Sequence, residues 1–265
     1  MPLNIVVCVK IVPKPEEVRL DPETSTLDRN SAENVLNPSD KNALEFALCL
    51  KEKHGGRITL LSMGPPFFDK LLRVSMAMGA DDAVLLTDRA FAGADTYPTS
   101  LTLAEGIRKL SDVDLVLCGE ESADGGTGQV PPGIAEWLGI ALTTYANEIS
   151  YDEGKDRFIA RRSISGGNEV LSIPRPAVIS VELGVNSPRF PNFNRIKKLA
   201  TTFKVTMWSA EKLGLEKTRL GLPGSHTTVD DLVEVASADR KRQFVEGTPQ
   251  EIASKLADII LDHGE

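Results

Sequence analysis

The first half of the chain repeats one pattern, an apolar run of strand length followed by a segment with apolar residues at helical spacing. Runs such as residues 3–9 are apolar throughout, which is typical of strands covered on both faces. Strands that alternate with helices at this spacing form βαβ units with right-handed crossovers and a parallel sheet. The predicted strands are residues 3–9, 57–63, 83–87 and 113–119, and the predicted helices are residues 38–54, 67–78, 96–110 and 133–142.

The start of the first helix carries local signals. Asn37 is a residue type that caps helices, Pro38 suits the first helical position, and Asp40 places a negative charge near the positive end of the helix dipole. The pair Gly55-Gly56 predicts the end of this helix.

The second half has a different pattern, in which residues 145–182 predict antiparallel strands. Those strands are expected at residues 145–152, 156–164, 168–173 and 175–183. Short elements follow, and a last helix from Pro249 to about His263 carries an apolar stripe. We therefore predict an α/β fold, with a mostly parallel, doubly wound sheet, an antiparallel second half, and an extended C-terminal loop and helix arm.

The amino-acid composition and net charge exclude several classes of protein. The 265 residues are 41% hydrophobic and carry a net charge of -8. This balance excludes a wholly disordered chain and argues against a nucleic-acid partner, which needs a basic surface. No apolar stretch reaches the roughly 18 residues of a membrane span. The start lacks the basic region of a secretory signal, so we expect a cytoplasmic protein.

Cysteines and histidines suggest no metal site. Cys8, Cys49 and Cys118 are an odd number, lie far apart in sequence, and fit neither a disulfide framework nor a CxxC motif. Cys8 and Cys118 fall in apolar runs, where cysteine is usually a small core residue. The three histidines are scattered, and we expect them on the solvated surface.

The most informative segment is Asp124-Gly125-Gly126-Thr127-Gly128-Gln129, which follows a predicted buried strand and precedes a helix. Ligands of open α/β sheets bind at this position, and glycines with free N–H groups at a helix start favour an anion. Two interpretations remain: a phosphate-binding loop, or a tight turn between strand and helix. Pro131 and Pro132 fit the first helical turn, whose N–H groups have no helical partner.

Known phosphate motifs and side-chain catalysts are absent. No Gly-Lys-Ser/Thr follows the loop, and the GxGxxG fingerprint is incomplete. There is no GxSxG, no HExxH and no paired His and Cys, so we predict no catalytic residue. A bound cofactor that carries the chemistry is more plausible.

Three other segments converge on the same sheet edge. Residues 8–10 end the first strand, residues 63–65 end the second, and Asn37 starts the first helix. The strands at 3–9 and 113–119 flank a predicted topological switch point, so these segments could surround one crevice. Each alone is more often structural.

A basic, proline-rich segment contrasts with the acidic chain. Residues 189–204 hold five Lys or Arg and no acid, and Phe190 and Phe193 lie among them. An exposed aromatic within a basic rim is typical of an interface, but packing against the chain's own domain is the alternative.

Over almost its whole length the sequence resembles the β-subunit of electron transfer flavoproteins. The resemblance lies in VVCVKIVP, NPSDKNALEFALCLKEK, SMGPP, AMGADDAVLL, DLVLCG, ISGGNEVLSIPRPAVISVELGVNSPRFPNFNRIKK and VTMWSAEKLGL. It implies a heterodimer with an α-subunit that holds the redox FAD. In the ordinary branch the β-subunit binds AMP and docks an acyl-CoA dehydrogenase.

In the electron-bifurcating branch, FAD occupies that β-subunit site and exchanges a hydride with NAD(H). The electrons are divided between ferredoxin or flavodoxin and a flavin dehydrogenase, which acts on an acyl-CoA or another substrate such as a 2-hydroxy acid. The short loop ESADGGTGQVPP and the segment VRLDPETSTLDR, residues 18–29, resemble this branch. Gly126 and Gly128 depart from it, since they replace an acid and an alanine.

The resemblance also assigns residues. Residues lining the adenosine end would be Cys8, Asn37, Asp40, Met63 and Gly64, and those of the diphosphate-binding stretch would be Asp124, Gly125, Gly126, Thr127, Gly128, Gln129 and Val130. Residues 186–198 match the recognition loop for the dehydrogenase, with Arg189 and Phe193 as docking residues. The last helix resembles the arm that binds the α-subunit.

The implied organisation is a nucleotide-binding domain at 1–185, a recognition loop at 186–204 and an α-subunit-docking segment at 205–265.

Overall fold

A computed structural model describes residues 2–14, 33–228 and 244–262. Its elements up to the centre of the chain are β1 (Leu3–Cys8), β2 (Ile11–Pro13), β3 (Asn34–Leu36), α1 (Pro38–His54), β4 (Gly56–Met63), η2 (Pro66–Phe68), α2 (Asp69–Met76), β5 (Asp82–Leu86), η3 (Arg89–Phe91), α3 (Thr96–Leu110), β6 (Leu115–Gly119) and α4 (Val130–Leu138). The remainder are β7 (Ala141–Asp152), β8 (Arg157–Ile164), β9 (Gly167–Pro174), β10 (Ala177–Val181), α5 (Phe193–Thr202), β11 (Thr206–Trp208), α6 (Ala210–Leu213), η4 (Lys217–Arg219), α7 (Gly221–Gly224) and α8 (Pro249–Asp262). The predicted segment at residues 18–29 lies outside the described residues.

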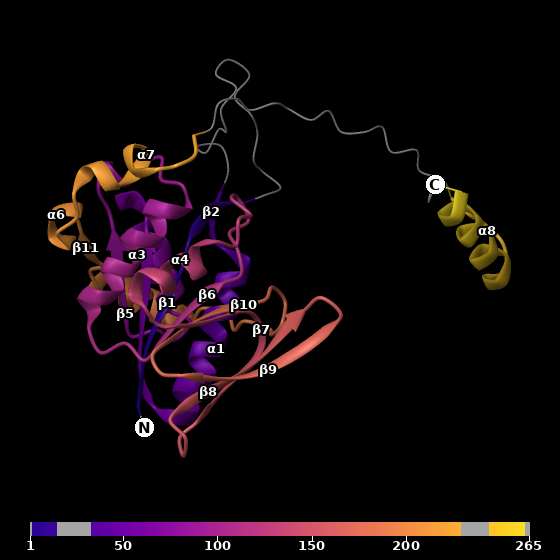
Figure 1. The fold of residues 1–265 in the computed structure, drawn as a ribbon, viewed down its shortest axis with the longest axis horizontal. Helices are drawn as coiled ribbons and strands as arrows, with labels where there is room; N and C mark the ends of the chain where they lie inside the picture. Colours follow the sequence, from indigo (N-terminus) through magenta and orange to yellow (C-terminus); the bar gives the residue numbers. More distant parts are fainter. Residues whose placement is uncertain (1, 15–32, 229–243, 263–265) are drawn as a thin grey trace. The chain divides into compact units, whose positions relative to one another are not determined.

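One mixed sheet organises residues 1–230 (Figure 1), with strand order β11-β5-β4-β1-β6-β10-β7-β8-β9. The strands from β11 to β7 pair in parallel, while β7, β8 and β9 pair antiparallel. The predicted α/β class with a mostly parallel sheet is confirmed. A small separate ladder joins β2 to β3.

The sheet is covered on both faces, because its central strands are apolar on both sides. One core contains Ile5 and Val7 of β1 with Leu44 and Leu48 of α1. The other contains Val6 of β1 together with side chains of α3 and α4. Burial of one such aliphatic side chain contributes about 1.5–3 kcal/mol, so the apolar runs read from the sequence supply the main driving force for this arrangement.

Residues 175–183 were predicted as an antiparallel strand, and this prediction is wrong. The strand β10 lies between β6 and β7 and pairs in parallel with both. Its five residues are all buried, as expected for a central strand covered on both faces. The antiparallel part of the sheet is therefore confined to β7, β8 and β9.

The helix predicted at residues 133–142 is shifted. The helix α4 begins at Val130, so Pro131 and Pro132 occupy its first turn, as predicted. It ends at Leu138 and is capped by Gly139, whose φ of 66° lies in the left-handed region that favours glycine. The apolar residues beyond Gly139 begin β7 instead of continuing the helix.

The basic segment also differs from the loop that was predicted. Phe193 begins the helix α5, and the side chain of Asn192 accepts a hydrogen bond from the Arg195 N–H at its start. Phe193 thus lies on a helix, while Phe190 precedes it.

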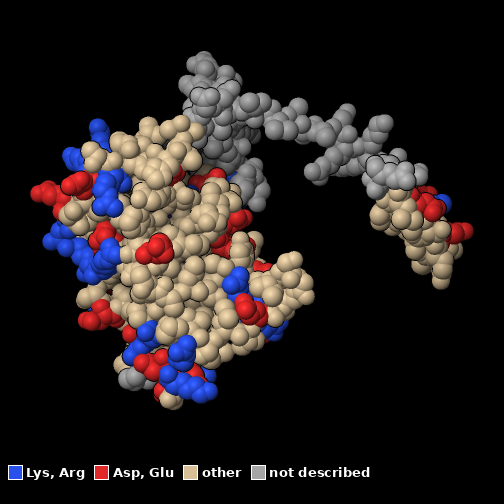
Figure 2. All heavy atoms as spheres, in the orientation of Figure 1, with Lys and Arg blue, Asp and Glu red and all other residues tan. Residues whose placement is uncertain are grey.

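Chain contacts divide the molecule into residues 1–230 and 231–265. The second unit contains α8, whose apolar side chains Leu256, Ile260 and Leu261 are exposed. In the first unit, Lys, Arg, Asp and Glu lie mixed at the edges of the face shown, and its centre is largely uncharged (Figure 2). No helix of the described residues is long and apolar enough to span a membrane.

Candidate functional site

The predicted topological switch point lies between β1 and β6, which are neighbours in the sheet. The helix α1, which follows β1, packs in one core, and α4, which follows β6, packs in the other. The chain therefore leaves the two strands toward opposite faces of the sheet, and a crevice is expected between their carboxyl ends.

A buried carboxylate joins these two strand ends. Asp40, in the first turn of α1, accepts hydrogen bonds from the N–H groups of Lys10 (2.6 Å) and Gly119 (3.1 Å). Burial raises the pKa of Asp40 to about 6, although these hydrogen bonds act in the opposite direction. Asp40 thus fixes the start of α1 against the switch point.

Gly119 permits this close approach. A Cβ at Gly119 would lie 2.2 Å from Ser39 Oγ and 2.4 Å from Asp40 Oδ1. Any larger residue would displace the helix start from the strand end. Sequence reasoning missed this role, because nothing in the local pattern shows which helix contacts the glycine.

Asn37 connects α1 to the loop after β6. Its side chain donates to the carbonyl oxygen of Glu121 (2.9 Å) and accepts from the Ala123 N–H (3.0 Å). Ser39 Oγ donates to the same carbonyl (2.8 Å). Asn37 occupies the N-cap position but its side chain does not cap α1, so the predicted cap is wrong in this respect.

The glycine-rich loop, residues 124–130, leads into α4. Gly126 and Gly128 have φ of 59° and 63°, in the left-handed region. The N–H groups of Gly125 and Gly126 donate to Ser122 O. Among the described residues, the N–H groups of Thr127, Gly128 and Val130 have no acceptor. These donors lie at the positive end of α4 and suit an anion.

A lysine that was not singled out lies beside this loop. Lys10 Nζ forms an ion pair with Asp124 Oδ1 at 2.6 Å and donates to Ser122 Oγ at 3.2 Å. Its side chain is 46% exposed. The ammonium group thus offsets the negative charge of Asp124 at the site where an anion is expected. Its place directly after β1 was the signal that could have identified it.

The other predicted residues lie along the same edge. Cys8 is buried beside Cys118, and both are free core cysteines, as predicted. The neighbouring Cys8 thiol and burial raise the pKa of Cys118. Met63 ends β4, the strand next to β1, and Gly64 follows it directly. A Cβ at Gly64 would lie 2.4 Å from the Phe68 ring, so this glycine has a packing role of its own.

The predicted docking residues lie at a different surface. Arg189 donates to Glu45 and Glu52 of α1, with Nη2 2.7 Å from Glu45 Oε1. These hydrogen bonds and ion pairs raise the pKa of Arg189, so its charge is used within the chain. Phe193 is 66% exposed, and Lys197 Nζ lies 4.7 Å from its ring centroid. Arg189 therefore holds the segment, while Phe193 is available to a partner.

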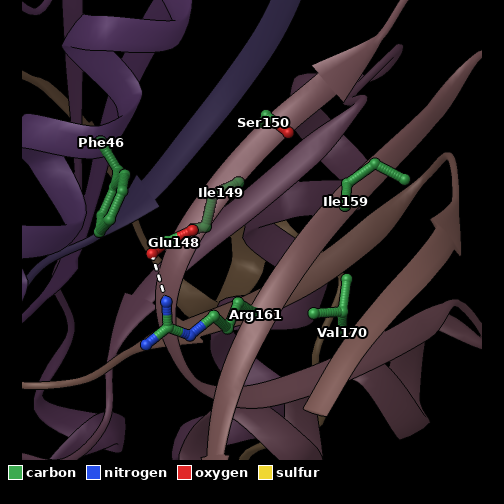
Figure 3. Close-up of a pocket in the computed structure, with 7 residues that line it drawn as sticks. All are labelled: Phe46, Glu148, Ile149, Ser150, Ile159, Arg161 and Val170. Carbon is green, nitrogen blue, oxygen red and sulfur yellow. Dashed lines mark hydrogen bonds and ion pairs between the residues drawn. The ribbon is translucent and has the colours of Figure 1, made fainter. Parts of the chain in front are cut away.

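The described part of the molecule contains cavities at two places that bear on the site. One, of about 360 Å³, lies between Phe46 of α1 and the antiparallel strands (Figure 3). The ion pair of Glu148 and Arg161 (2.7 Å) lies on its wall, and none of the predicted site residues lines it. The other, of about 440 Å³, is lined by residues of α3 and α4, by Gln129 of the glycine-rich loop, and by Leu142 of β7.

The expected surface position of the histidines is wrong for His54. Its side chain is 4% exposed, and Nδ1 lies 2.6 Å from Glu153 Oε1. His226 stacks on Tyr97 with 4.4 Å between the ring centroids. The described residues contain no cluster of side chains suited to a metal ion.

Residues 24–212 match the model of the electron transfer flavoprotein domain. The chain is 40% identical over 256 residues to the electron transfer flavoprotein subunit beta of Thermoanaerobacterium thermosaccharolyticum, covering 97% of each chain. It is 45% identical over 229 residues to the subunit beta of Clostridium acetobutylicum and 41% identical over 228 residues to the caffeyl-CoA reductase-Etf complex subunit CarD of Acetobacterium woodii, covering 86% of each chain in both cases.

Proposed function

Because the chain belongs to the electron transfer flavoprotein β-subunit family, we propose that it binds FAD in the crevice between β1 and β6 and serves electron bifurcation or confurcation. When bound, this flavin would exchange a hydride with NAD(H) and divide electrons between ferredoxin or flavodoxin and a flavin dehydrogenase. An α-subunit that carries the second flavin is the required partner.

The residues of the crevice fit a diphosphate. The observation that supports the proposal best is the set of three N–H groups, of Thr127, Gly128 and Val130, that have no acceptor among the described residues. Lys10 neutralises Asp124 beside them, so that carboxylate does not repel a phosphate, and Gly126 has open space where a side chain would stand. Backbone donors at a helix start are a usual means of holding phosphate groups.

The chain's own residues would bind and orient the nucleotide. Asn37 and Ser39 hold the loop after β6 against α1, and Asp40 fixes the ends of β1 and β6. The loop donors can therefore be in position before the ligand arrives, which lowers the entropic cost of binding. No described side chain is assigned a nucleophilic or acid–base role.

One observation favours FAD over AMP at this site. The loop between β6 and α4 is short and resembles the pattern of the bifurcating branch. The relative CarD, a subunit of a caffeyl-CoA reductase-Etf complex, supports a role in a complex with a dehydrogenase or reductase under either cofactor. The alternative is a β-subunit that binds AMP structurally and serves only to dock an acyl-CoA dehydrogenase.

For the dehydrogenase, the proposed docking element is the start of α5. Phe190 and Phe193 are 93% and 66% exposed, and four cationic residues follow them within residues 195–204. An exposed aromatic with a basic rim suits a partner with an apolar pocket and acidic edges. Arg189 acts indirectly, by fixing the segment to α1.

Cofactor content tests the proposal. The chain is coexpressed with its α-subunit, the heterodimer is purified and denatured, and released nucleotides are separated and counted. Two FAD and no AMP per heterodimer are expected. One FAD with one AMP would contradict FAD binding and support the docking-only alternative. Bleaching of flavin absorbance by NADH in the intact heterodimer is the second expected result.

A further inference from the structure

Tyr145 of β7 has a backbone conformation that does not occur in a regular strand. Tyr145 has a φ of 55°, although it is not a glycine. It lies where the pairing of β7 with β10 changes register, between the pairs of Ile179 and Val181. The Tyr145 N–H donates to the buried Ser180 Oγ at 3.2 Å. Bulges of this kind redirect a side chain and are frequent beside functional sites.

The redirected side chain meets the glycine-rich loop. A Cβ built on Gly128 would lie 3.4 Å from the Tyr145 hydroxyl oxygen. The ring is 43% exposed, and the hydroxyl has no hydrogen-bond partner among the described residues. A left-handed backbone at a bulky residue is strained, and such strain is typical of positions that serve binding. The result is an unpaired donor beside the loop.

The order of the strands in the sheet indicates where the Tyr145 hydroxyl lies relative to the proposed nucleotide. Along the sheet edge the strands are β4, β1, β6, β10 and β7. The residues assigned to adenosine lie at β4, β1 and the start of α1, whereas Tyr145 lies on β7, two strands beyond β6. The loop spans this interval, with Asp124 bound to Lys10 after β1 and Gly128 beside Tyr145.

We propose that Tyr145 determines specificity for a dinucleotide, because its hydroxyl donates a hydrogen bond to the part of the ligand beyond the adenylate. This inference rests on the proposed function and names the residue that distinguishes FAD from AMP. A mononucleotide that ends at its single phosphate does not reach this donor.

Tyr145→Phe tests the proposal in the heterodimer with its α-subunit flavin retained and the β-subunit nucleotide removed. FAD and AMP are titrated separately by calorimetry. The Kd for FAD should rise about tenfold, as expected for a lost hydrogen bond to a charged group, while the Kd for AMP should change less than twofold. Tyr151→Phe is the matched control, since its hydroxyl bonds Asp156 and both affinities should stay unchanged.

A second variant separates binding from folding. Asn tolerates the left-handed region, so Tyr145→Asn should keep or raise the melting temperature of the protein while lowering its affinity for FAD. Unchanged FAD affinity in both variants would overturn the role of Tyr145 and leave the proposed function intact. An equal loss of affinity for FAD and AMP would also overturn the role of Tyr145, because its side chain would then affect only the conformation of the glycine-rich loop. If the unmodified heterodimer bound AMP and not FAD, the proposed function and this inference would both be wrong.

Discussion

At the scale of single residues, Asp40 determines how the first helix meets the sheet. Its carboxylate accepts N–H groups from two neighbouring strand ends while almost wholly removed from water. The sequence marked it as an acid in a first helical turn, but its partners come from residues 30 and 79 positions away. Its titration should therefore report on the integrity of the switch point.

Asp40 should lower the stability of the protein as the pH rises, which is the opposite of the usual effect of an acidic residue. Its folded-state pKa of about 6 lies above the ordinary value of 3.8, so its contribution is complete below pH 4 and is lost as the pH rises through 6. The stability difference between the unmodified protein and Asp40→Asn should fall by on the order of 3 kcal/mol from pH 4 to pH 7. Urea unfolding at several pH values measures it.

Asp88→Asn provides the opposite control. The Ala90 N–H and further backbone hydrogen bonds lower the pKa of Asp88, so its contribution is present at neutral pH and lost as the pH falls. The stability difference for this variant should increase with pH. The same slope in both variants would mean that Asp40 is not the group responsible.

Gly126 and Gly166 share a backbone state but differ in location. Both have positive φ and no atom within 4 Å of an added Cβ, but Gly166 lies in the turn between β8 and β9. Replacing either by Val should cost about 1–2 kcal/mol of stability through backbone strain. Only Gly126→Val should lose the β-subunit nucleotide, measured as FAD content of the purified heterodimer. Equal FAD content in the two variants would show that Gly126 does not face the diphosphate.

At the scale of elements, the segment before α5 is fixed to α1 by one arginine. The Arg189 guanidinium bonds Glu45, whose side chain is 10% exposed, and also the exposed Glu52. Burial raises the pKa of Glu45, but the stronger combined effect of the Arg189 hydrogen bonds and charge lowers it. The sequence placed Arg189 in the docking surface, and the structure shows its charge already engaged.

Arg189→Ala should lower the free energy of unfolding by on the order of 2 kcal/mol, because it leaves the Glu45 carboxylate without its partner. Arg161→Ala removes an exposed ion pair with Glu148 and should cost less than about 1 kcal/mol. Chemical denaturation compares the two. Similar losses would indicate that the Arg189 pair is energetically an ordinary surface contact.

Phe193 should act on the partner and not on the fold. Its ring is exposed at the first residue of α5, so Phe193→Ala should leave stability and FAD content unchanged. Electron delivery to the dehydrogenase should weaken, by about 2 kcal/mol if the ring fills a pocket of the partner. Val170→Ala, at the same exposed fraction on β9, is the control for stopped-flow reduction of the partner. Unchanged reduction in Phe193→Ala would discard the docking role.

At the scale of the whole molecule, the chain separates into one large unit and a short terminal one. Residues 1–230 contain both cores, whereas residues 231–265 contain α8 with its exposed apolar stripe. The predicted boundaries at 185 and 204 remain predictions about function. Within the large unit, β11 at residues 206–208 joins the sheet beside β5.

A chain ending at Asp230 should therefore fold. Its melting temperature should stay within a few degrees of the full chain, because both cores are retained. If α8 binds the α-subunit through Leu256, Ile260 and Leu261, association should be markedly weaker, as measured by copurification and analytical ultracentrifugation. A heterodimer of unchanged stability would contradict the docking role of α8.

The local sequence pattern was sufficient to predict those helices and strands whose type and bounds depend only on their own residues. The apolar runs of β1, β4, β5 and β6 and the start and end of α1 follow from periodicity, proline and glycine, since these act within a few positions of the chain. The boundary between α4 and β7 was missed because the apolar residues after Gly139 suit either state, and only the left-handed cap decides.

The direction of β10 could not be predicted from the local sequence pattern. Its buried run is compatible with either orientation, and its partners β6 and β7 are chosen by the packing of the whole sheet. The same holds for the Asp40–Gly119 contact, the pairing of Lys10 with Asp124 and the position of the Tyr145 hydroxyl beside Gly128. Each joins residues of different elements, and such distances are set only when the chain has closed into its tertiary structure.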